Sequence, residues 1–144
     1  EGPSYKLFTR EFYEIVKQKL TPHGLLSIQA STTSPVALKT YTVLSKTLQE
    51  VFPNVFPYAA YIPSFALLWG FCLATNDLDP YQVSREEIDQ RISKRVDGEL
   101  RFYDGITHQA LFNLPKYIRK ALKEQTHISR DNKPIMEQYP GLDK

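Results

Sequence analysis

The sequence predicts an α/β fold, with a mainly parallel sheet that ends in an antiparallel hairpin and is flanked by helices. The order of the predicted elements is one observation: helix, strand, helix, two strands, then small helices. The aromatic stretch 55–74 is the other, because two apolar runs flank a break at residues 62–65. Proline cannot donate to a sheet ladder, so we expect Pro63 to interrupt the pairing there.

The first predicted helix covers residues 9–20, where Phe12, Val16 and Leu20 recur at helical spacing. The hydroxyl of Thr9 is suited to cap its first turn. The Thr-Pro-His-Gly run that follows ends the helix and makes a turn. Residues 25–29 are then expected to form a short buried strand.

The second helix is predicted to start at Ser34 and Pro35, a capping hydroxyl followed by a proline at the first helical position. It should run to about Val51, where a Phe-Pro-Asn sequence ends it. Two strands are expected next, at residues 56–61 and 67–74.

Three small helices complete the predicted fold. Ser84 and Glu87 match a capping box, which predicts a helix to about Arg95. Residues 106–112 form a second helix in this scheme, and a third begins at residues 113–115 and ends near Lys123. We expect one domain over residues 1–123 and an irregular, polar tail over residues 124–144.

Composition argues against several classes of partner. The net charge is +2 and the basic residues are scattered, which predicts neither nucleic-acid nor membrane-surface binding. The longest apolar run, 65–74, is too short to span a bilayer. Cys72 has no partner for an internal disulfide, is expected to be buried, and fits a reducing, cytoplasmic compartment. The chain starts at Glu1 without a methionine, so we expect a further segment before it.

No self-contained catalytic set is evident in the sequence. The three histidines, His23, His108 and His127, are widely spaced, so no metal site is predicted. There is no glycine-rich loop for a phosphate and no nucleophile elbow. His108 lies on an apolar helix face, and we interpret it as structural.

Several segments, taken in order, carry a family pattern. They are GPSYKLFT (2–9), GLLSIQ (24–29), YIPSF with WGF (61–71), LRFY (100–103) and HQALFNLP (108–115). Together they make the span from Gly2 to about Lys123 resemble the second half of the spermidine synthase (polyamine aminopropyltransferase) family. The resemblance implies the C-terminal part of a Rossmann-like, methyltransferase-type fold that forms dimers or tetramers and serves polyamine and spermidine biosynthesis.

The resemblance also implies the reaction and a nucleoside-binding group. The family transfers an aminopropyl group from decarboxylated S-adenosylmethionine, a co-substrate, to an amine, and no bound cofactor is expected. By this likeness Pro3, Ser4 and Leu7 would contact the adenine, whose faces suit apolar contact.

An amine-binding group is implied at Gln29, Tyr61, Pro63, Phe65 and Trp69. Gln29 would lie at the carboxyl end of a strand, where its amide oxygen can contact a polyamine nitrogen. Phe65 stands where many members carry a tyrosine, so it keeps the ring for cation–π attraction and loses the hydroxyl. The residues after it, 66–68, also depart from the family's Pro-Ser-Gly. Putrescine is the default acceptor, and agmatine or a longer amine stays open.

The resemblance places the catalytic aspartates upstream of Glu1, together with the nucleotide loop. We therefore predict no catalytic residue in this chain, inactivity of the chain alone, and a missing N-terminal half as its partner. Two alternatives stay open: another nucleoside-dependent transferase of the same fold, such as a methyltransferase, and a non-catalytic interaction or dimerisation remnant. The segment at 108–115 favours the aminopropyltransferase over the methyltransferase.

Overall fold

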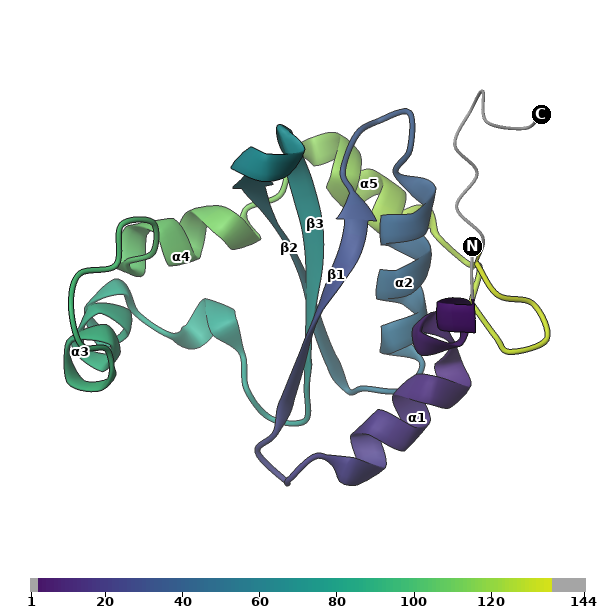
Figure 1. Cartoon of the computed structure of the whole chain (residues 1–144), viewed down its shortest axis with the longest axis horizontal. Helices are drawn as coiled ribbons and strands as arrows, with labels where there is room; N and C mark the ends of the chain where they lie inside the picture. The colour runs from purple at the N-terminus through teal and green to yellow at the C-terminus, as the bar shows by residue number, and fades with distance from the viewer. Residues whose placement is uncertain (1–2, 136–144) are drawn as a thin grey trace.

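The computed structural model describes residues 3–135 and arranges them as a small sheet with helices on one face and at its edges (Figure 1). The elements in chain order are η1 (Pro3–Phe8), α1 (Arg10–Lys19), β1 (Leu25–Thr32), α2 (Lys39–Gln49), β2 (Asn54–Ile62), η2 (Pro63–Phe65), β3 (Leu67–Thr75), η3 (Pro80–Gln82), α3 (Arg85–Arg95), α4 (Gly105–Phe112) and α5 (Lys116–Glu124). Within this described part, no helix has the length and apolar character needed to cross a membrane.

The sheet has the strand order β1-β3-β2, and both pairings are antiparallel. The α/β class and the predicted hairpin of β2 and β3 are confirmed, with the chain reversing at η2 as Pro63 predicted. The expected parallel pairing is wrong for the described strands. β1 and β2 do point the same way across the α2 crossover, but β3 returns from the hairpin and occupies the position between them.

Side-chain caps begin three of the helices where the sequence predicted helices. Thr9 Oγ1 accepts the Phe12 N–H of α1 at 3.4 Å, and Ser84 Oγ accepts the Glu87 N–H of α3 at 3.1 Å. Asp104 Oδ1 accepts the Thr107 N–H of α4 at 2.7 Å, and this bond lowers the pKa of the exposed Asp104 carboxyl. These bonds satisfy donors that the first helical turn leaves unpaired.

The start of α2 and the end of β1 differ from the prediction. α2 begins at Lys39 rather than at Ser34, and β1 continues to Thr32 past an irregularity after Gln29. The cause is tertiary: both the N–H and the hydroxyl of Thr33 donate to the Leu68 carbonyl oxygen, at 3.2 and 2.8 Å. The loop is therefore bound to β3, and the residues after Ser34 form a turn closed by the Ala37 N–H.

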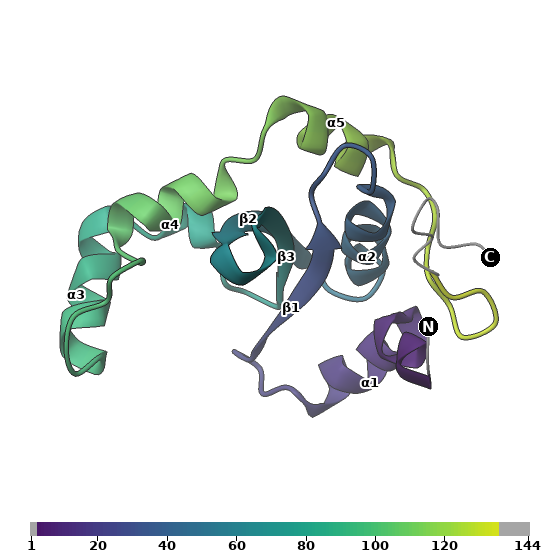
Figure 2. The same ribbon diagram turned by 45° about the horizontal axis from the view of Figure 1, so that its top comes forward.

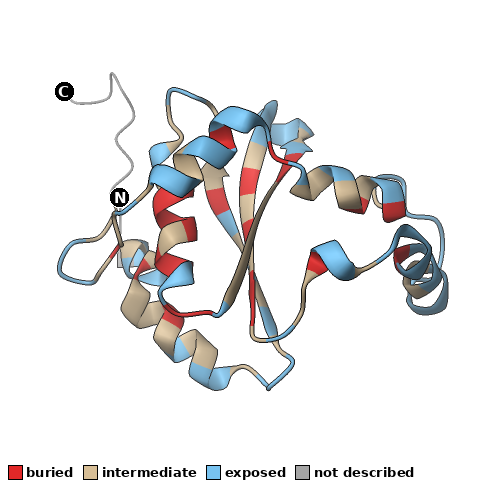
Figure 3. Ribbon diagram, turned by 180° about the vertical axis from the view of Figure 1, so that it is seen from behind, coloured by how far each residue is buried: buried red, intermediate tan, exposed pale blue. Residues whose placement is uncertain are grey.

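The core lies between α2 and one face of the sheet (Figure 3). Tyr41 of α2 is fully buried against Gly70 of β3, where a Cβ atom would lie 2.5 Å from the tyrosine ring. Its hydroxyl donates to the Tyr58 carbonyl oxygen at 3.1 Å. Cys72 is buried on the same face, as predicted, and burial raises the pKa of its thiol to about 12.

Helices α3 and α4 form an arm at the β2 edge of the sheet (Figures 1 and 2). Gly105 lets the two helices approach, because a Cβ atom there would meet the backbone of Arg85. His108 holds the arm to η3: its Nε2 donates to the Pro80 carbonyl oxygen at 2.8 Å, and its Nδ1 accepts from the Tyr103 hydroxyl at 2.7 Å. Both ring nitrogens are occupied, so the structural interpretation of His108 is confirmed.

The last part of the chain is closely packed where it is described. Residues 125–135 contain neither helix nor strand apart from one isolated bridge between Arg130 and Lys133, yet Ser129 among them is fully buried. Residues 136–144 of the expected irregular tail lie outside the described residues.

Candidate functional site

An open aromatic face lies on the side of the sheet that α2 does not cover. Phe71 of β3 is paired with Gln29 of β1 on one side and with Tyr58 of β2 on the other. Directly paired residues point to the same face, so these three side chains share it. Tyr58 and Phe71 stack with ring centroids 5.2 Å apart, while Gln29 is exposed.

The kink at η2 adds a further ring to this open aromatic face. Trp69 lies two residues before Phe71 on β3 and therefore points the same way. The ring of Phe65 packs against Trp69 with centroids 4.6 Å apart, and 42% of Phe65 is exposed. The structure thus brings Gln29, Trp69 and Phe65 to one face.

Two other residues of the expected amine-binding group lie differently. Tyr61 is paired with Leu68, one position along from the pair of Ala60 and Trp69, and so it points to the opposite face of the sheet. It is 55% exposed there. Pro63 opens η2, is exposed, and ends the ladder of β2 rather than contributing to the aromatic face.

The expected nucleoside-binding residues are grouped in η1, directly before α1. Ser4 is exposed and Leu7 is 49% exposed, so both are available to a ligand. Pro3 is the first residue of the same element, and Gly2 lies outside the described residues. Figures 1 and 2 both show η1 beside α1 and apart from η2.

Sequence reasoning missed three members of the open aromatic face. Tyr58 and Phe71 contribute its central rings, and Ser27 Oγ lies 3.1 Å from the Tyr58 hydroxyl. The sequence did contain a hint of this grouping. Ser27 and Gln29, like Trp69 and Phe71, are two positions apart, the spacing at which side chains of a strand point to the same face. That spacing alone does not say which strand lies beside which.

The open aromatic face is chemically uncharged. Its named members offer π-faces, hydroxyl groups and one amide, but no carboxylate that could take a proton. Trp69 Nε1 is buried without a hydrogen-bond partner among the described residues. Nowhere in residues 3–135 do three or more metal-ligating side chains gather. Aromatic π-faces of this kind attract cations, and an amide oxygen accepts a hydrogen bond from an N–H.

Two hollows among the described residues adjoin the β2 side of this face, because Phe112 lines both and packs against Tyr58 with ring centroids 5.1 Å apart. One, of about 330 Å³, lies between α2, the β2 edge and α5, and Lys46, Arg119 and Lys123 are at its rim. The other, of about 170 Å³, lies beside His108 and Tyr81. None of the residues predicted to bind the amine or the nucleoside lines either hollow.

Comparison with known proteins gives close relatives of this chain. Residues 1–86 match the Spermine/spermidine synthase domain. The polyamine aminopropyltransferase of Sulfolobus acidocaldarius is 42% identical over 135 residues, and polyamine aminopropyltransferase 2 of Hyperthermus butylicus is 43% identical over 135 residues. The alignments cover 94% and 93% of this chain. The chain spans 44% of the length of each relative.

Solved structures share the fold. The crystal structure of spermidine synthase from Thermotoga maritima superimposes with a TM-score of 0.70 at 24% identity, covering 86% of this chain and 41% of that one. A spermidine synthase in complex with the transition state analogue AdoDATO gives a TM-score of 0.68, also at 24% identity, covering 83% of this chain and 40% of that one. The resemblance seen in the sequence is confirmed, and the chain belongs to the spermine/spermidine synthase domain family.

Proposed function

We propose that this chain supplies the amine-binding wall of a polyamine aminopropyltransferase. The enzyme would move the aminopropyl group of decarboxylated S-adenosylmethionine to an amine such as putrescine or agmatine. One observation carries the proposal: Gln29, Phe65 and Trp69 lie on one open aromatic face, in a chain about 40% identical to polyamine aminopropyltransferases.

The chemistry of this face suits a polyamine, which alternates positive nitrogens with methylene groups. The rings of Phe65 and Trp69 attract an ammonium group by about 0.5–2 kcal/mol each and also pack against methylenes. The Gln29 amide oxygen accepts a hydrogen bond from an amine N–H. Phe65 has no hydroxyl, so it contributes no hydrogen bond to the acceptor, which distinguishes its contact from that of a tyrosine.

The proposed reaction is a displacement at carbon. The lone pair of a neutral amine nitrogen forms a C–N bond to the carbon beside the sulfonium, and the C–S bond breaks with its electron pair going to sulfur. Neutral methylthioadenosine leaves, and the nitrogen gives up one proton. The residues of this chain would hold the nitrogen in line with the C–S bond, an orientation effect that can supply a large part of the rate.

The proton acceptor is proposed to lie in protein outside this chain. The open aromatic face holds no carboxylate, and the chain spans 44% of the length of its relatives. A positioned base contributes about 10²–10⁴-fold in rate. We therefore propose that the chain needs an N-terminal half as its partner and that it is inactive alone.

Other properties of the whole protein follow from the same proposal. Residues 1–123 would belong to the catalytic domain, with Pro3, Ser4 and Leu7 against the adenine. The protein would work in the cytoplasm as a homo-oligomer, a dimer or tetramer.

The decisive experiment is an assay of the full-length gene product. Decarboxylated S-adenosylmethionine is supplied with a panel of amines, and release of methylthioadenosine is measured. We expect turnover with putrescine or agmatine. Absence of turnover with every amine would contradict the proposal, and methylation of the same amines by S-adenosylmethionine would instead favour a methyltransferase.

A further inference from the structure

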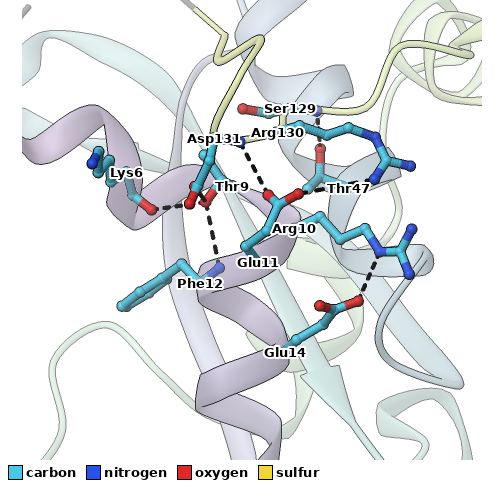
Figure 4. A network of polar contacts seen from close by, with 10 residues as sticks. All are labelled: Lys6, Thr9, Arg10, Glu11, Phe12, Glu14, Thr47, Ser129, Arg130 and Asp131. Carbon is cyan, nitrogen blue, oxygen red and sulfur yellow. Dashed lines mark hydrogen bonds and ion pairs between the residues drawn. The ribbon is translucent and has the colours of Figure 1, made fainter.

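The segment 125–135, called the strap below, joins two helices that are distant from it in sequence. Figure 4 shows it lying across the first turn of α1 and the side of α2. Its first residue is anchored on α2, where Gln125 Nε2 donates to Thr42 Oγ1 at 2.8 Å. The strap contributes no regular element of its own, so its conformation depends on these tertiary contacts.

Ser129 is the centre of the strap and connects three parts of the molecule. Its N–H donates to Thr47 Oγ1 of α2 at 3.0 Å, and its carbonyl oxygen accepts the Arg10 N–H of α1 at 2.9 Å. Its hydroxyl oxygen accepts the Ile135 N–H at 2.9 Å, which folds the strap back on itself. Ser129 and Thr47 are fully buried, so water does not compete for these bonds.

The strap also completes the N-terminus of α1. The Arg10 N–H belongs to the first helical turn and has no acceptor within the helix, so the Ser129 carbonyl takes that place. Thr9, the N-cap, has one hydroxyl proton and two acceptors in reach: Asp131 Oδ1 at 2.7 Å and Lys6 O at 3.0 Å. The shorter bond to the carboxylate is the stronger, and the helix dipole favours a negative charge at this end.

A second pair of contacts fixes the strap on the other side of the same turn. The Asp131 N–H donates to Glu11 Oε2 at 3.1 Å, and Arg130 Nη1 lies 3.9 Å from Glu11 Oε1. Asp131 thus contacts α1 both through its side chain and through its backbone. Because it is exposed, its replacement leaves no cavity in the core.

We propose that the strap positions η1 for the nucleoside, with Asp131 and Ser129 as positioning residues; this inference rests on the proposed function. Thr9 follows η1 without a break, so holding the first turn of α1 determines where Ser4 and Leu7 stand. The hydrogen bonds of Ser129 and Asp131 described above go to Thr47, Ile135, Thr9, Arg10 and Glu11, and not to Ser4 or Leu7. Their effect is transmitted through Thr9 and the backbone of Arg10 and Glu11.

The test uses the full-length gene product and the Asp131→Ala variant. Binding of methylthioadenosine is measured by calorimetry, and KM is measured for the amine. We expect the Kd for methylthioadenosine to rise about twofold to thirtyfold, the range for positions that couple to a site without contact, while the KM for the amine stays unchanged. The conservative variant Asp131→Asn keeps an oxygen that can accept from Thr9, and it should restore much of the affinity.

Asp97→Ala is the matched control, because it removes an exposed carboxylate from the α3–α4 connection and should leave both values unchanged. If the wild type binds methylthioadenosine and Asp131→Ala binds it with the same Kd, the role of the strap is refuted, and the proposed function is not affected. A KM for the amine that rises as much as the Kd would show a general loss of structure and overturn it as well. Failure of the wild type to bind methylthioadenosine would refute the proposed function, and the strap's role with it.

Discussion

The two faces of the sheet use aromatic residues in different ways. On the face that α2 covers, Tyr41 is fully buried, its hydroxyl is bonded to the Tyr58 carbonyl, and its ring fills the space that Gly70 leaves. On the open aromatic face, Gln29 of the same sheet and Phe65 of η2 remain accessible. Similar side chains thus stabilise the fold on one face and are available to a ligand on the other.

This contrast makes burial the useful guide to a residue's role. A buried ring contributes through packing, and its loss leaves a cavity. An exposed ring contributes little to folding, and it is accessible to a ligand. Three experiments test whether the covered face governs stability while the open aromatic face governs ligand binding.

The largest effect is expected from Tyr41→Ala on the covered face. It removes a fully buried ring and a hydrogen bond, so the free energy of unfolding should fall by about 3–5 kcal/mol. Urea-induced unfolding of the full-length gene product measures this. Tyr61→Ala is the matched control, because Tyr61 is 55% exposed and its loss should change stability by less than about 0.5 kcal/mol. Equal losses in the two variants would show that the contrast does not hold.

The reactivity of the Cys72 thiol and the pH dependence of stability report on the packing of the covered face without any mutation. Burial raises the pKa of this thiol from 9.0 to about 12, so the folded protein keeps the proton at pH values where the unfolded chain loses it. Its contribution to stability is therefore complete below about pH 9 and should decline as the pH rises from there toward 12. At pH 8 a thiol reagent should label the protein only after unfolding. Rapid labelling of the folded protein would show that the covered face is open.

A smaller effect is expected from Phe65→Ala on the open aromatic face. Loss of one cation–π contact of about 0.5–2 kcal/mol should raise the KM for the amine about twofold to thirtyfold, with little change in methylthioadenosine affinity. Phe102→Ala, which removes a ring that is 59% exposed on the α3–α4 arm, is the control. Equal effects of Phe65→Ala on both ligands would indicate that Phe65 only packs against Trp69.

The sequence predicted much of the local structure and part of the site. Thr9 and Ser84 cap the helices that they were expected to cap, and Pro63 marks the reversal between two strands. Gln29 and Phe65, chosen on the family resemblance, share one face of the sheet with Trp69. Tyr61 does not, because the register turns it to the other side.

The sequence alone determined where most helices and strands begin and end, because caps, prolines and strand alternation act over a few neighbouring residues. Only the tertiary structure decided that β3 lies between β1 and β2. It also decided that Thr33 bonds to the Leu68 carbonyl oxygen, so that α2 begins later than predicted, and that the strap contacts α1. The bond between Thr9 and Asp131 spans 122 positions. No local pattern encodes such a partner, because its position is set by how the whole chain packs.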